Sequence, residues 1–154
     1  MGLWSALRDY IFYRADRVGK DGVIFKLYKF RSMVKGADRL GPVSVSGDDK
    51  RVTLVGRFLR KWHIDELPNL INVAKGDMVL IGPRPEVKHY IDKLTAEQRK
   101  IVLSVKPGCL DPATLWNLNE GERLKGQEDP EAYYEREIWP QKVKMQIDYI
   151  LKRS

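Results

Sequence analysis

Two carboxylates stand side by side in the sequence, at Asp65 and Glu66, and three basic residues shortly precede them, at Arg57, Arg60 and Lys61. A carboxylate beside cations stays ionised at neutral pH. In that form it can attack a phosphoryl centre as a nucleophile, or hold a divalent cation through hard oxygen ligands. An Asp-Glu pair is also common at a solvated helix N-terminus, where negative charge suits the helix dipole. The pair alone therefore leaves catalysis and simple capping open.

The second motif that could do chemistry is Gly82-Pro83-Arg84-Pro85. Glycine permits a close backbone approach, and the two prolines fix the chain on both sides of the arginine. An arginine held in this way is pre-organised for bidentate binding of a phosphate group. The same four residues also suit an ordinary turn after a strand, so the motif indicates a phosphate clamp only in company with other charged residues.

Three further basic residues in the sequence could contribute to the same phosphate site. Lys29 and Arg31 are two positions apart, which places them on one face of a strand, and Lys106 lies beside another proline turn. Each of these signals is weak on its own. Together with the carboxylate pair and the arginine clamp, they predict a phosphate-rich, metal-assisted site.

Short-range signals predict the elements that position the first half of this site. Residues 10–33 alternate apolar and polar side chains around Asp21-Gly22, which is typical of a β-hairpin with a tight turn. Apolar residues at helical spacing predict a helix over 51–62. A second helix is expected over 65–76, with Pro68 in its first turn and Gly76 at its end.

The elements of the second half are predicted by similar signals. Residues 77–82 indicate a short buried strand, and residues 85–104 indicate helix in two pieces with Thr95 as an N-cap. Residues 105–118 contain two prolines and predict irregular chain. The remainder is charged and helical, with one helix starting at Asp129-Pro130 and Trp139-Pro140 separating it from the last.

Length and composition bound the fold. A chain of 154 residues with 43% hydrophobic composition fits one compact domain. We expect a mixed α+β fold within the α/β class, dominated by helices, with a small β-hairpin or sheet and amphipathic interfacial helices. The single cysteine, Cys109, excludes an internal disulfide and suits a reducing setting.

The charge of the chain is uneven and points to an anionic partner. Residues 1–64 carry 14 basic and 6 acidic side chains, whereas residues 65–154 carry 14 and 15. A phosphorylated ligand or an anionic lipid surface fits this excess, and a solvated basic face is the simpler alternative. A nucleic acid is not expected, because no recognisable module is present and the aromatic residues are not interleaved with basic ones.

The start of the chain predicts surface contact with lipid at most. No stretch reaches the 18 or so apolar residues of a spanning helix, and Arg8 and Asp9 interrupt any signal peptide. Residues 1–10 form a short amphipathic segment whose apolar residues share one helical face. That segment either touches a membrane interface through Trp4 or packs on the domain.

Three stretches together resemble one known family. "RVGKDGVIFKLYKFRSM", "LVGRFLRKWHIDELPNLINVAKGDMVLIGPRP" and "VKPG" look like the bacterial sugar transferases, in the monotopic phosphoglycosyl transferase superfamily. The likeness runs from about Ile11 to the C-terminus, so residues 11–154 would be the catalytic domain. The N-terminal re-entrant membrane helix of the family is not expected in this chain.

The resemblance implies an activity and its partners. Members transfer a sugar-1-phosphate from a UDP-sugar to polyprenyl (undecaprenyl) phosphate, which releases UMP and begins the assembly of a capsule, O-antigen, exopolysaccharide or glycoconjugate. The mechanism implied is ping-pong, at the cytoplasmic face of the bacterial inner membrane. Which sugar is used, and whether the chain forms a homodimer, stay open.

The resemblance also implies roles for residues of this chain. Asp65 would be the nucleophile that carries the phosphosugar, and Glu66 would coordinate Mg²⁺, or Mn²⁺ in its place, with Asp65 beside it. The substrate and phosphate groups would be bound by a larger set: Lys29, Arg31, Gly82, Pro83, Arg84, Pro85 and Lys106.

One difference from the family pattern leaves a second function open. Leu118 stands where relatives with a similar "DPAT" segment have an arginine. The alternative is therefore a catalytically impaired, membrane-associated binding or scaffold domain of the same fold.

Overall fold

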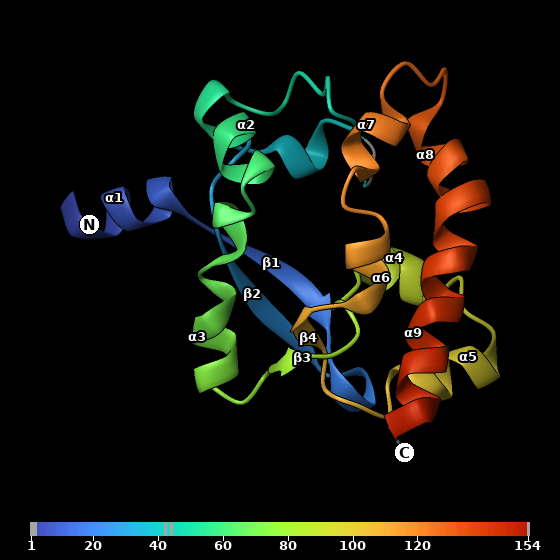
Figure 1. Ribbon diagram of the computed structural model, residues 1–154. Helices are drawn as coiled ribbons and strands as arrows, with labels where there is room; N and C mark the ends of the chain where they lie inside the picture. Colours follow the sequence, from blue (N-terminus) through green and yellow to red (C-terminus); the bar gives the residue numbers. More distant parts are fainter. Residues whose placement is uncertain (1–2, 42, 44, 154) are drawn as a thin grey trace.

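The computed structural model describes residues 3–41, 43 and 45–153, with side chains from residue 7 onward. Helix α1 (Leu3–Ile11) leads into a hairpin of strands β1 (Phe12–Val18) and β2 (Ile24–Phe30), which pair from Phe12↔Phe30 to Val18↔Ile24 (Figure 1). The predicted turn is confirmed: Asp21 and Gly22 take positive φ angles of 58° and 79° in a single 3₁₀ turn, η1 (Lys20–Gly22). The side chain of Trp4 lies outside the described part of the chain.

Between the hairpin and the second sheet, the chain forms two short helices joined by a tight turn. After a loop with one 3₁₀ turn, η2 (Ala37–Arg39), helix α2 (Leu54–Lys61) begins at Thr53, whose side chain accepts a hydrogen bond from Gly56 N. A 3₁₀ turn, η3 (Ile64–Glu66), then leads into α3 (Asn69–Ala74). Both predicted helices are present.

A single buried amide holds α3 against the hairpin. Asn72 is fully buried, and its side chain accepts from Tyr28 N at 3.0 Å and donates to Lys26 O at 2.8 Å. It also donates to the Asp77 carboxylate at 3.1 Å. Because an unsatisfied buried amide costs free energy, these bonds fix the position of α3 relative to β2.

A second, parallel sheet joins residues from distant parts of the chain. Strands β3 (Val79–Ile81) and β4 (Gly108–Leu110) pair at Val79↔Gly108 and Ile81↔Leu110. The predicted strand is present, but the prediction that it is buried is wrong, since all three of its residues are exposed. Within the described residues it pairs with one strand, β4. The stretch 105–118 is also more regular than predicted, because β4 and helix α6 (Pro112–Trp116) lie within it.

The C-terminal half is helical. Helices α4 (Lys88–Ile91) and α5 (Ala96–Val102) are the two predicted pieces, and Thr95 caps the second through a reciprocal bond with Gln98. Helix α7 (Glu120–Leu124) follows α6. The last segment comprises α8 (Pro130–Tyr133), a π turn η4 (Tyr134–Ile138) and α9 (Trp139–Arg153).

The predicted break at Trp139-Pro140 is wrong. Helices α8 and α9 run on from one another through the π turn, as Figure 1 shows. Trp139 N donates to Tyr134 O, five residues back. Such a wide turn changes the local hydrogen-bond pattern, so the proline, which has no N–H, is accommodated at the start of α9 without a break.

The buried core lies on one side of the molecule. Its members come from α4, the turn after it, α5, α7, the π turn and α9, together with the end of β1: Val18, Tyr90, Ile91, Leu94, Val102, Leu124, Tyr134, Ile138, Trp139 and Val143. Helices α1, α2 and α3 lie on the other side (Figure 1). The predicted helix-dominated α+β domain is confirmed. Among the described helices, none is long and apolar enough to cross a membrane.

Gly56 determines how closely α2 approaches the hairpin. A Cβ at this position would lie 1.8 Å from the carbonyl oxygen of Ser32, which is backbone and cannot swing away. We expect Gly56→Ala to lower the free energy of unfolding by about 2–3 kcal/mol, because the clash outweighs alanine's advantage of about 1 kcal/mol in a helix. Urea unfolding measures the change.

The control is Gly121→Ala in α7. There a Cβ would lie 3.3 Å from the backbone nitrogen of Gly47, a contact that a shift of a few tenths of an ångström relieves, so the same substitution should cost far less stability than at Gly56. If both variants were equally stable, close packing at Gly56 would not position α2.

Candidate functional site

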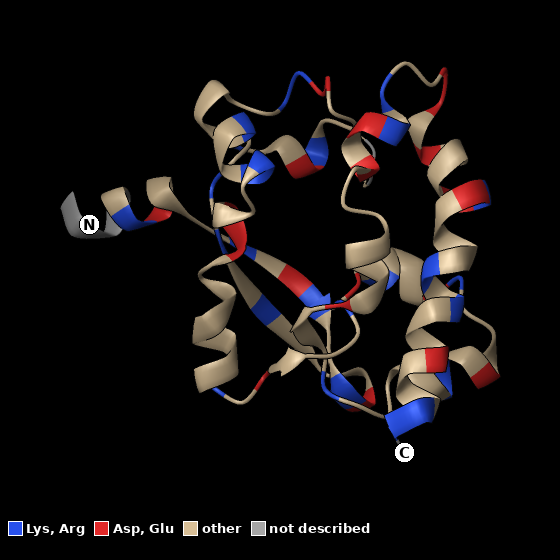
Figure 2. Cartoon of the chain, viewed as in Figure 1, with Lys and Arg blue, Asp and Glu red and all other residues tan. Residues whose placement is uncertain are grey.

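A cleft of about 750 Å³ opens between the hairpin, α2 with η3, and the segment from α6 to α7. Four of the residues predicted from the sequence line it: Lys29, Asp65, Glu66 and Arg84. Figure 2 shows basic residues on α2 and along the hairpin, with acidic residues on the turn between α2 and α3. Seven basic side chains line the cleft in all: Arg17, Lys29, Arg57, Arg60, Lys61, Arg84 and Lys142.

The centre of the cleft is a carboxylate held by two cations. Lys29 Nζ lies 3.0 Å from Glu66 Oε1. Arg84 grips the same carboxylate with both nitrogens of its fork, Nη2 at 2.5 Å from Oε1 and Nη1 at 3.2 Å from Oε2. This bidentate geometry is the strongest form of a carboxylate–arginine pair. The predicted clamp therefore faces the predicted carboxylate pair directly.

The three charges shift one another's pKa values. Burial alone would raise the pKa of Glu66, but Arg84 and Lys29 outweigh it and hold that pKa far below its usual range. The charge of Glu66 raises the pKa of Arg84. Burial lowers the pKa of Lys29, although Glu66 opposes this effect. Glu66 is consequently ionised at any physiological pH.

Asp65 is a buried carboxylate on the wall of the same cleft. No hydrogen bond to its side chain is found within the described chain, in contrast to Glu66. Asp65 and Glu66 are consecutive residues of the 3₁₀ turn η3. His63, just before this turn, has a φ of 54°, so the chain changes direction sharply after α2. Asp65 thus presents uncommitted oxygens toward the cleft.

Adjacent carboxylates of this kind fit a hard divalent cation. Mg²⁺ in proteins is bound by one or two carboxylates, with substrate phosphates and water as its other ligands. A carboxylate has about four acceptor positions, and Glu66 uses three of them on Arg84 and Lys29. The free oxygens of Asp65 and the remaining position on Glu66 are the hard ligands that this site can offer.

The backbone around Arg84 is fixed from several directions. Gly82 N donates to Leu110 O at 3.0 Å, and Gly108 N donates to Pro83 O at 2.8 Å. Arg84 N donates to the Asp111 carboxylate at 3.0 Å. With Pro83 and Pro85 restricting φ, the arginine has little freedom to leave the carboxylate.

Gly108 and Asp111 complete this support. A Cβ on Gly108 would lie 2.1 Å from Gly82 N, so only glycine allows β3 and β4 to pair this closely. Asp111 is almost fully buried, caps α6 through Ala113 N, and accepts from Gln146 of α9 at 3.0 Å. Sequence reasoning missed Asp111, although an aspartate directly before a proline is a recognisable helix start.

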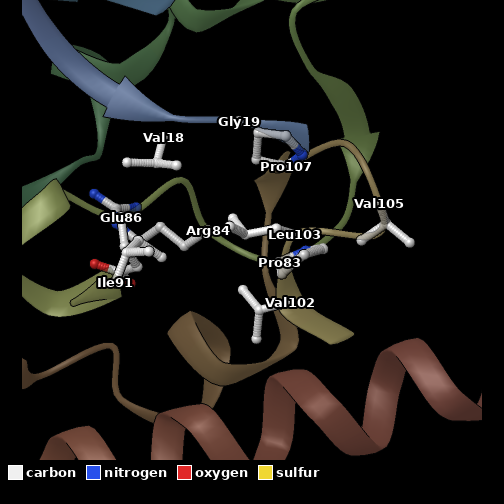
Figure 3. Close-up of a pocket in the computed structure, with 10 residues that line it drawn as sticks. All are labelled: Val18, Gly19, Pro83, Arg84, Glu86, Ile91, Val102, Leu103, Val105 and Pro107. Atoms are coloured by element: carbon white, nitrogen blue, oxygen red, sulfur yellow. The ribbon is translucent and has the colours of Figure 1, made fainter. Parts of the chain in front are cut away.

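Behind Arg84 the chain is tightly packed. A cavity of about 10 Å³ lies between the segment that holds Pro83, Arg84 and Glu86 and the side chains of Val102 and Leu103. Figure 3 draws the residues that line it. That volume is close to the minimum for one water molecule. Val18 N also donates to Glu86 O at 3.0 Å. The cavity is too small for a substrate, so the larger cleft is the candidate binding site.

Two of the predicted basic site residues are placed elsewhere. Arg31, directly after β2, donates to the carbonyl oxygens of Asp9, Tyr10 and Phe12, and so holds the junction of α1 and β1 to the end of β2. Lys106 Nζ lies 3.7 Å from the Cβ position of Gly76, near the end of α3. Neither residue lines the cleft.

Sequence reasoning also missed cations that the fold brings into the cleft. Arg17 comes from β1, and within the described residues its side chain donates one hydrogen bond, to Asp16 O. Burial lowers its pKa, and the nearby charge of Arg84 lowers it further. Lys142 comes from α9 and donates to Tyr134 OH at 2.9 Å, with Glu120 at 3.5 Å. Both lie too far from the motifs in sequence to be assigned without the fold. Leu118 lines the cleft as well.

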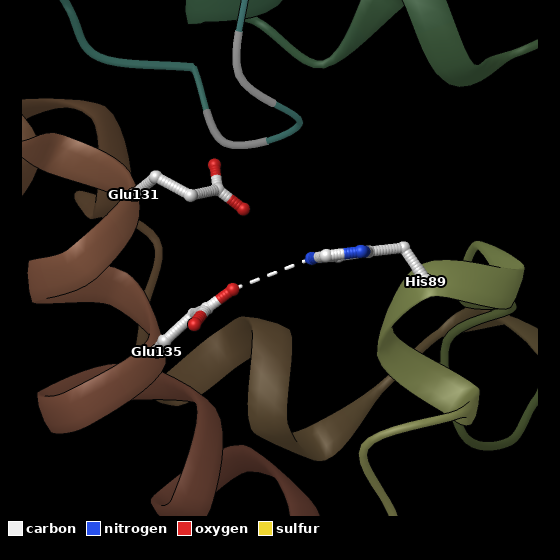
Figure 4. A group of neighbouring side chains, drawn as sticks. All are labelled: His89, Glu131 and Glu135. Carbon is white, nitrogen blue, oxygen red and sulfur yellow. Dashed lines mark hydrogen bonds and ion pairs between the residues drawn. The ribbon is translucent and has the colours of Figure 1, made fainter.

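A separate group of possible ligands lies away from the cleft. His89, Glu131 and Glu135 face one another between α4 and the start of the long C-terminal helix (Figure 4). Lys93 Nζ already lies 2.7 Å from Glu135, and Tyr90 OH donates to Glu131 at 2.5 Å. Because a cation and a hydroxyl hold these carboxylates, we assign the group to the packing of α4 on α8.

The amino-acid sequence of this chain matches a known protein family. Residues 3–154 match the family described as bacterial sugar transferase. The chain belongs to this family. The predicted resemblance is therefore confirmed.

Three relatives illustrate the similarity. The UDP-N-acetylgalactosamine-undecaprenyl-phosphate N-acetylgalactosaminephosphotransferase of Aeromonas hydrophila is 46% identical over 56% of this chain and 21% of its own length. The undecaprenyl-phosphate galactose phosphotransferase of Salmonella typhimurium is 40% identical over 70% and 25%. The exopolysaccharide production protein ExoY of Sinorhizobium fredii is 36% identical over 71% and 53%. The chain spans about half or less of the length of these relatives.

The ion pairs of Glu66 with Arg84 and Lys29 should contribute measurably to the stability of the fold. Glu66→Gln leaves Arg84 and Lys29 without their counter-charge, and we expect it to lower the free energy of unfolding at pH 7 by about 2–4 kcal/mol. The control Glu122→Gln alters an acidic residue of the cleft that has no ion pair within the described residues, and should change the free energy of unfolding by less than about 0.5 kcal/mol. Urea unfolding of the three proteins measures both changes.

The pH dependence follows from the lowered pKa of Glu66. Its stabilisation is fully present above the unfolded pKa of about 4.3 and is lost as the pH falls toward the folded value. The difference between wild type and Glu66→Gln should therefore be constant from pH 8 to pH 5 and shrink below pH 4. A difference that did not depend on pH would contradict the ion-pair assignment.

Proposed function

We propose that this chain carries the catalytic site of a transferase that moves a sugar-1-phosphate from a UDP-sugar to polyprenyl phosphate. The products are a polyprenyl-diphospho-sugar and UMP, and the reaction begins the assembly of a surface polysaccharide or glycoconjugate. One observation carries the proposal: Asp65 presents uncommitted carboxylate oxygens in a cleft lined by seven basic side chains. Family membership and the names of the relatives support the same substrate class.

The first half-reaction uses Asp65 as the nucleophile. One carboxylate oxygen attacks the β-phosphorus of the UDP-sugar, and the bond from that phosphorus to the oxygen bridging the two phosphates breaks. UMP leaves with that oxygen, and the sugar-1-phosphoryl group stays on Asp65. Covalent catalysis of this kind needs a carboxylate oxygen that is free to attack, and no hydrogen bond within the described residues occupies those of Asp65 on the wall of the cleft.

The second half-reaction restores the enzyme. An oxygen of polyprenyl phosphate attacks the same phosphorus, and the bond to Asp65 breaks. The carboxylate returns to its starting form and the diphosphate of the product is complete. Because UMP leaves before the lipid reacts, one site serves both steps in a ping-pong sequence.

The cations bind and orient the charged groups. Arg84 and Lys29, held on Glu66, and the uncommitted Arg17 would neutralise the phosphates of the donor. Glu66 keeps the two cations in place and stands beside Asp65. Mg²⁺, or Mn²⁺ in its place, would be held by Asp65 and Glu66 and would neutralise charge on the transferring phosphoryl group.

An apolar side of the molecule suits a lipid-borne acceptor. We define the apolar face of α2 as Leu54, Val55 and Phe58, whose exposed fractions are 83%, 68% and 58%. Further exposed apolar side chains lie on α1 and around α3: Leu7, Tyr10, Ile11, Leu67, Leu70 and Ile71. These helices lie away from the core. Soluble surfaces rarely carry so many large apolar groups, so we assign this side to the membrane interface, at the cytoplasmic face of the inner membrane.

Leu118 favours a second candidate function. It is exposed on the wall of the cleft and supplies no charge to a phosphate. A scaffold domain of the same fold, with membrane binding but without transfer, would keep the apolar side and lack turnover. The catalytic and lipid-binding measurements that follow separate the two candidates.

The catalytic proposal is tested by UMP release. With Mg²⁺, undecaprenyl phosphate and a panel of UDP-sugars that includes N-acetylgalactosamine and galactose, wild type should release UMP and form a covalent adduct at Asp65, visible by intact mass. Asp65→Asn should form no adduct and lose at least about a thousandfold in rate, because an amide is a far weaker nucleophile. Release of UMP by Asp65→Asn at the wild-type rate would refute this role. Membrane binding without any UMP release would favour the scaffold.

The membrane proposal is tested by co-sedimentation with phospholipid vesicles. Leu54→Ser with Phe58→Ser should weaken binding at least about tenfold, since burial of each large apolar side chain contributes about 1.5–3 kcal/mol. The control Leu151→Ser changes a leucine on α9 whose exposed fraction, 56%, is close to the 58% of Phe58, and should bind like wild type. Equal loss in both variants would show that α2 is not the lipid-facing element.

A further inference from the structure

Helix α2 has two functional faces. Its apolar face is turned outward, whereas Arg57, Arg60 and Lys61, spaced three and four residues apart, share another face and line the cleft. We call these three residues the basic face of α2. Gly56 lies on a third side, packed on the backbone of Ser32, and so fixes the rotation of the helix about its own axis. A single helix therefore borders both the apolar exterior and the charged cleft.

The charges on the basic face are largely uncommitted. Arg57 has no hydrogen bond or ion pair to another side chain within the described residues. Lys61 makes only a contact with the Trp62 ring there, at 5.7 Å. Arg60 donates to Ser32 Oγ at 2.9 Å. Lys29 and Arg84, in contrast, are already paired with Glu66. The cleft thus contains a second set of cations, which can accept an anion without breaking an existing ion pair.

The basic face is also placed to serve Asp65. Burial lowers the pKa of Arg60, while the charge of Asp65 is the first influence that opposes it. Only the turn at Trp62 and His63 separates the end of α2 from η3. An anion on the basic face would therefore lie on the same side of Asp65 as α2, and the Glu66–Arg84–Lys29 group would remain available to a different anion.

We propose that the basic face of α2 binds the phosphate of the lipid acceptor, while the lipid chain lies along the apolar face of the same helix. The inference rests on the proposed function, and it divides the cleft into a donor side at Arg84 and Lys29 and an acceptor side at α2. The ligand is a phosphate monoester on an apolar chain. Its oxygen then attacks the phosphorus on Asp65, and the bond from that phosphorus to the carboxylate breaks.

The two sides of the cleft are assigned from the direction in which each substrate would approach it. A UDP-sugar is soluble and can enter from water, whereas a lipid phosphate stays at the level of the membrane surface. Among the cleft cations, those of α2 share their helix with the outward apolar residues Leu54, Val55 and Phe58. Cations at the boundary between apolar and aqueous regions are well placed to meet a lipid phosphate.

The first experiment measures binding alone. Neutral phosphatidylcholine vesicles are prepared with undecaprenyl phosphate, with undecaprenol, or with phosphatidylglycerol at equal content. Undecaprenyl phosphate should increase co-sedimentation of wild type about tenfold over undecaprenol, and Arg57→Gln with Lys61→Gln should lose most of that increase. No increase for wild type, or the same increase with phosphatidylglycerol, would overturn the acceptor site whether or not the enzyme is active.

A matched control accounts for the loss of charge. Lys144→Gln with Lys152→Gln removes the same two charges from exposed positions of α9, and should retain the full increase. If this control lost as much as the α2 variant, general attraction to the vesicle would explain the binding and the proposal would fail.

The second experiment separates the two half-reactions. Without lipid phosphate, the α2 double variant should release its single equivalent of UMP within about twofold of the wild-type rate. Its adduct should then react about tenfold more slowly with undecaprenyl phosphate below saturation. Slow UMP release with normal lipid use would assign the basic face to the donor instead. Absence of any adduct in wild type would refute the proposed function, and the binding experiment would still decide the acceptor site.

Discussion

The ion pair network of Glu66 holds the cleft together. Its carboxylate joins Lys29 of the hairpin to Arg84 of the proline clamp, residues that are 37 and 18 positions away from it in sequence. Two cations around one carboxylate leave a net positive charge, so the group is assembled without substrate and still attracts an anion. Because all three partners are partly buried, solvent screens the interaction less than it would on an open surface.

The network needs a rigid backbone behind it, and glycine and asparagine provide much of this rigidity. Gly108 lets β4 approach Gly82, Gly56 lets α2 approach Ser32, and Asn72 fastens α3 to β2. In each of these three contacts, the backbone of one segment is held against its neighbour. A rigid backbone keeps the long arginine and lysine side chains of the site in place before a ligand binds. Without it, each binding event would cost more side-chain conformational entropy.

Local signals in the sequence predicted much of the site. Turn glycines, helix caps and the proline clamp gave the hairpin, the helices before and after the carboxylates, and the facing positions of Glu66 and Arg84. Arg31 was predicted to share one face of a strand with Lys29, but β2 ends at Phe30, and the partners of Arg31 are carbonyl oxygens where α1 meets β1. Asp111, Arg17 and Lys142 contribute through contacts between distant segments, which no short pattern encodes. Burial of β3 was also mispredicted, since apolar composition does not say whether another layer covers a strand.

The π turn at Tyr134–Ile138 has a consequence for how the family can vary. A π turn contains one residue more than the regular helix around it, and each residue of an α-helix turns the chain by about 100°. Deletion of a single residue there would rotate α8 relative to α9. Glu131, which meets Tyr90, and Gln146, which meets Asp111, could then no longer keep both contacts. Loss of one residue from this short segment would therefore disturb the packing of the C-terminal half more than most substitutions within it.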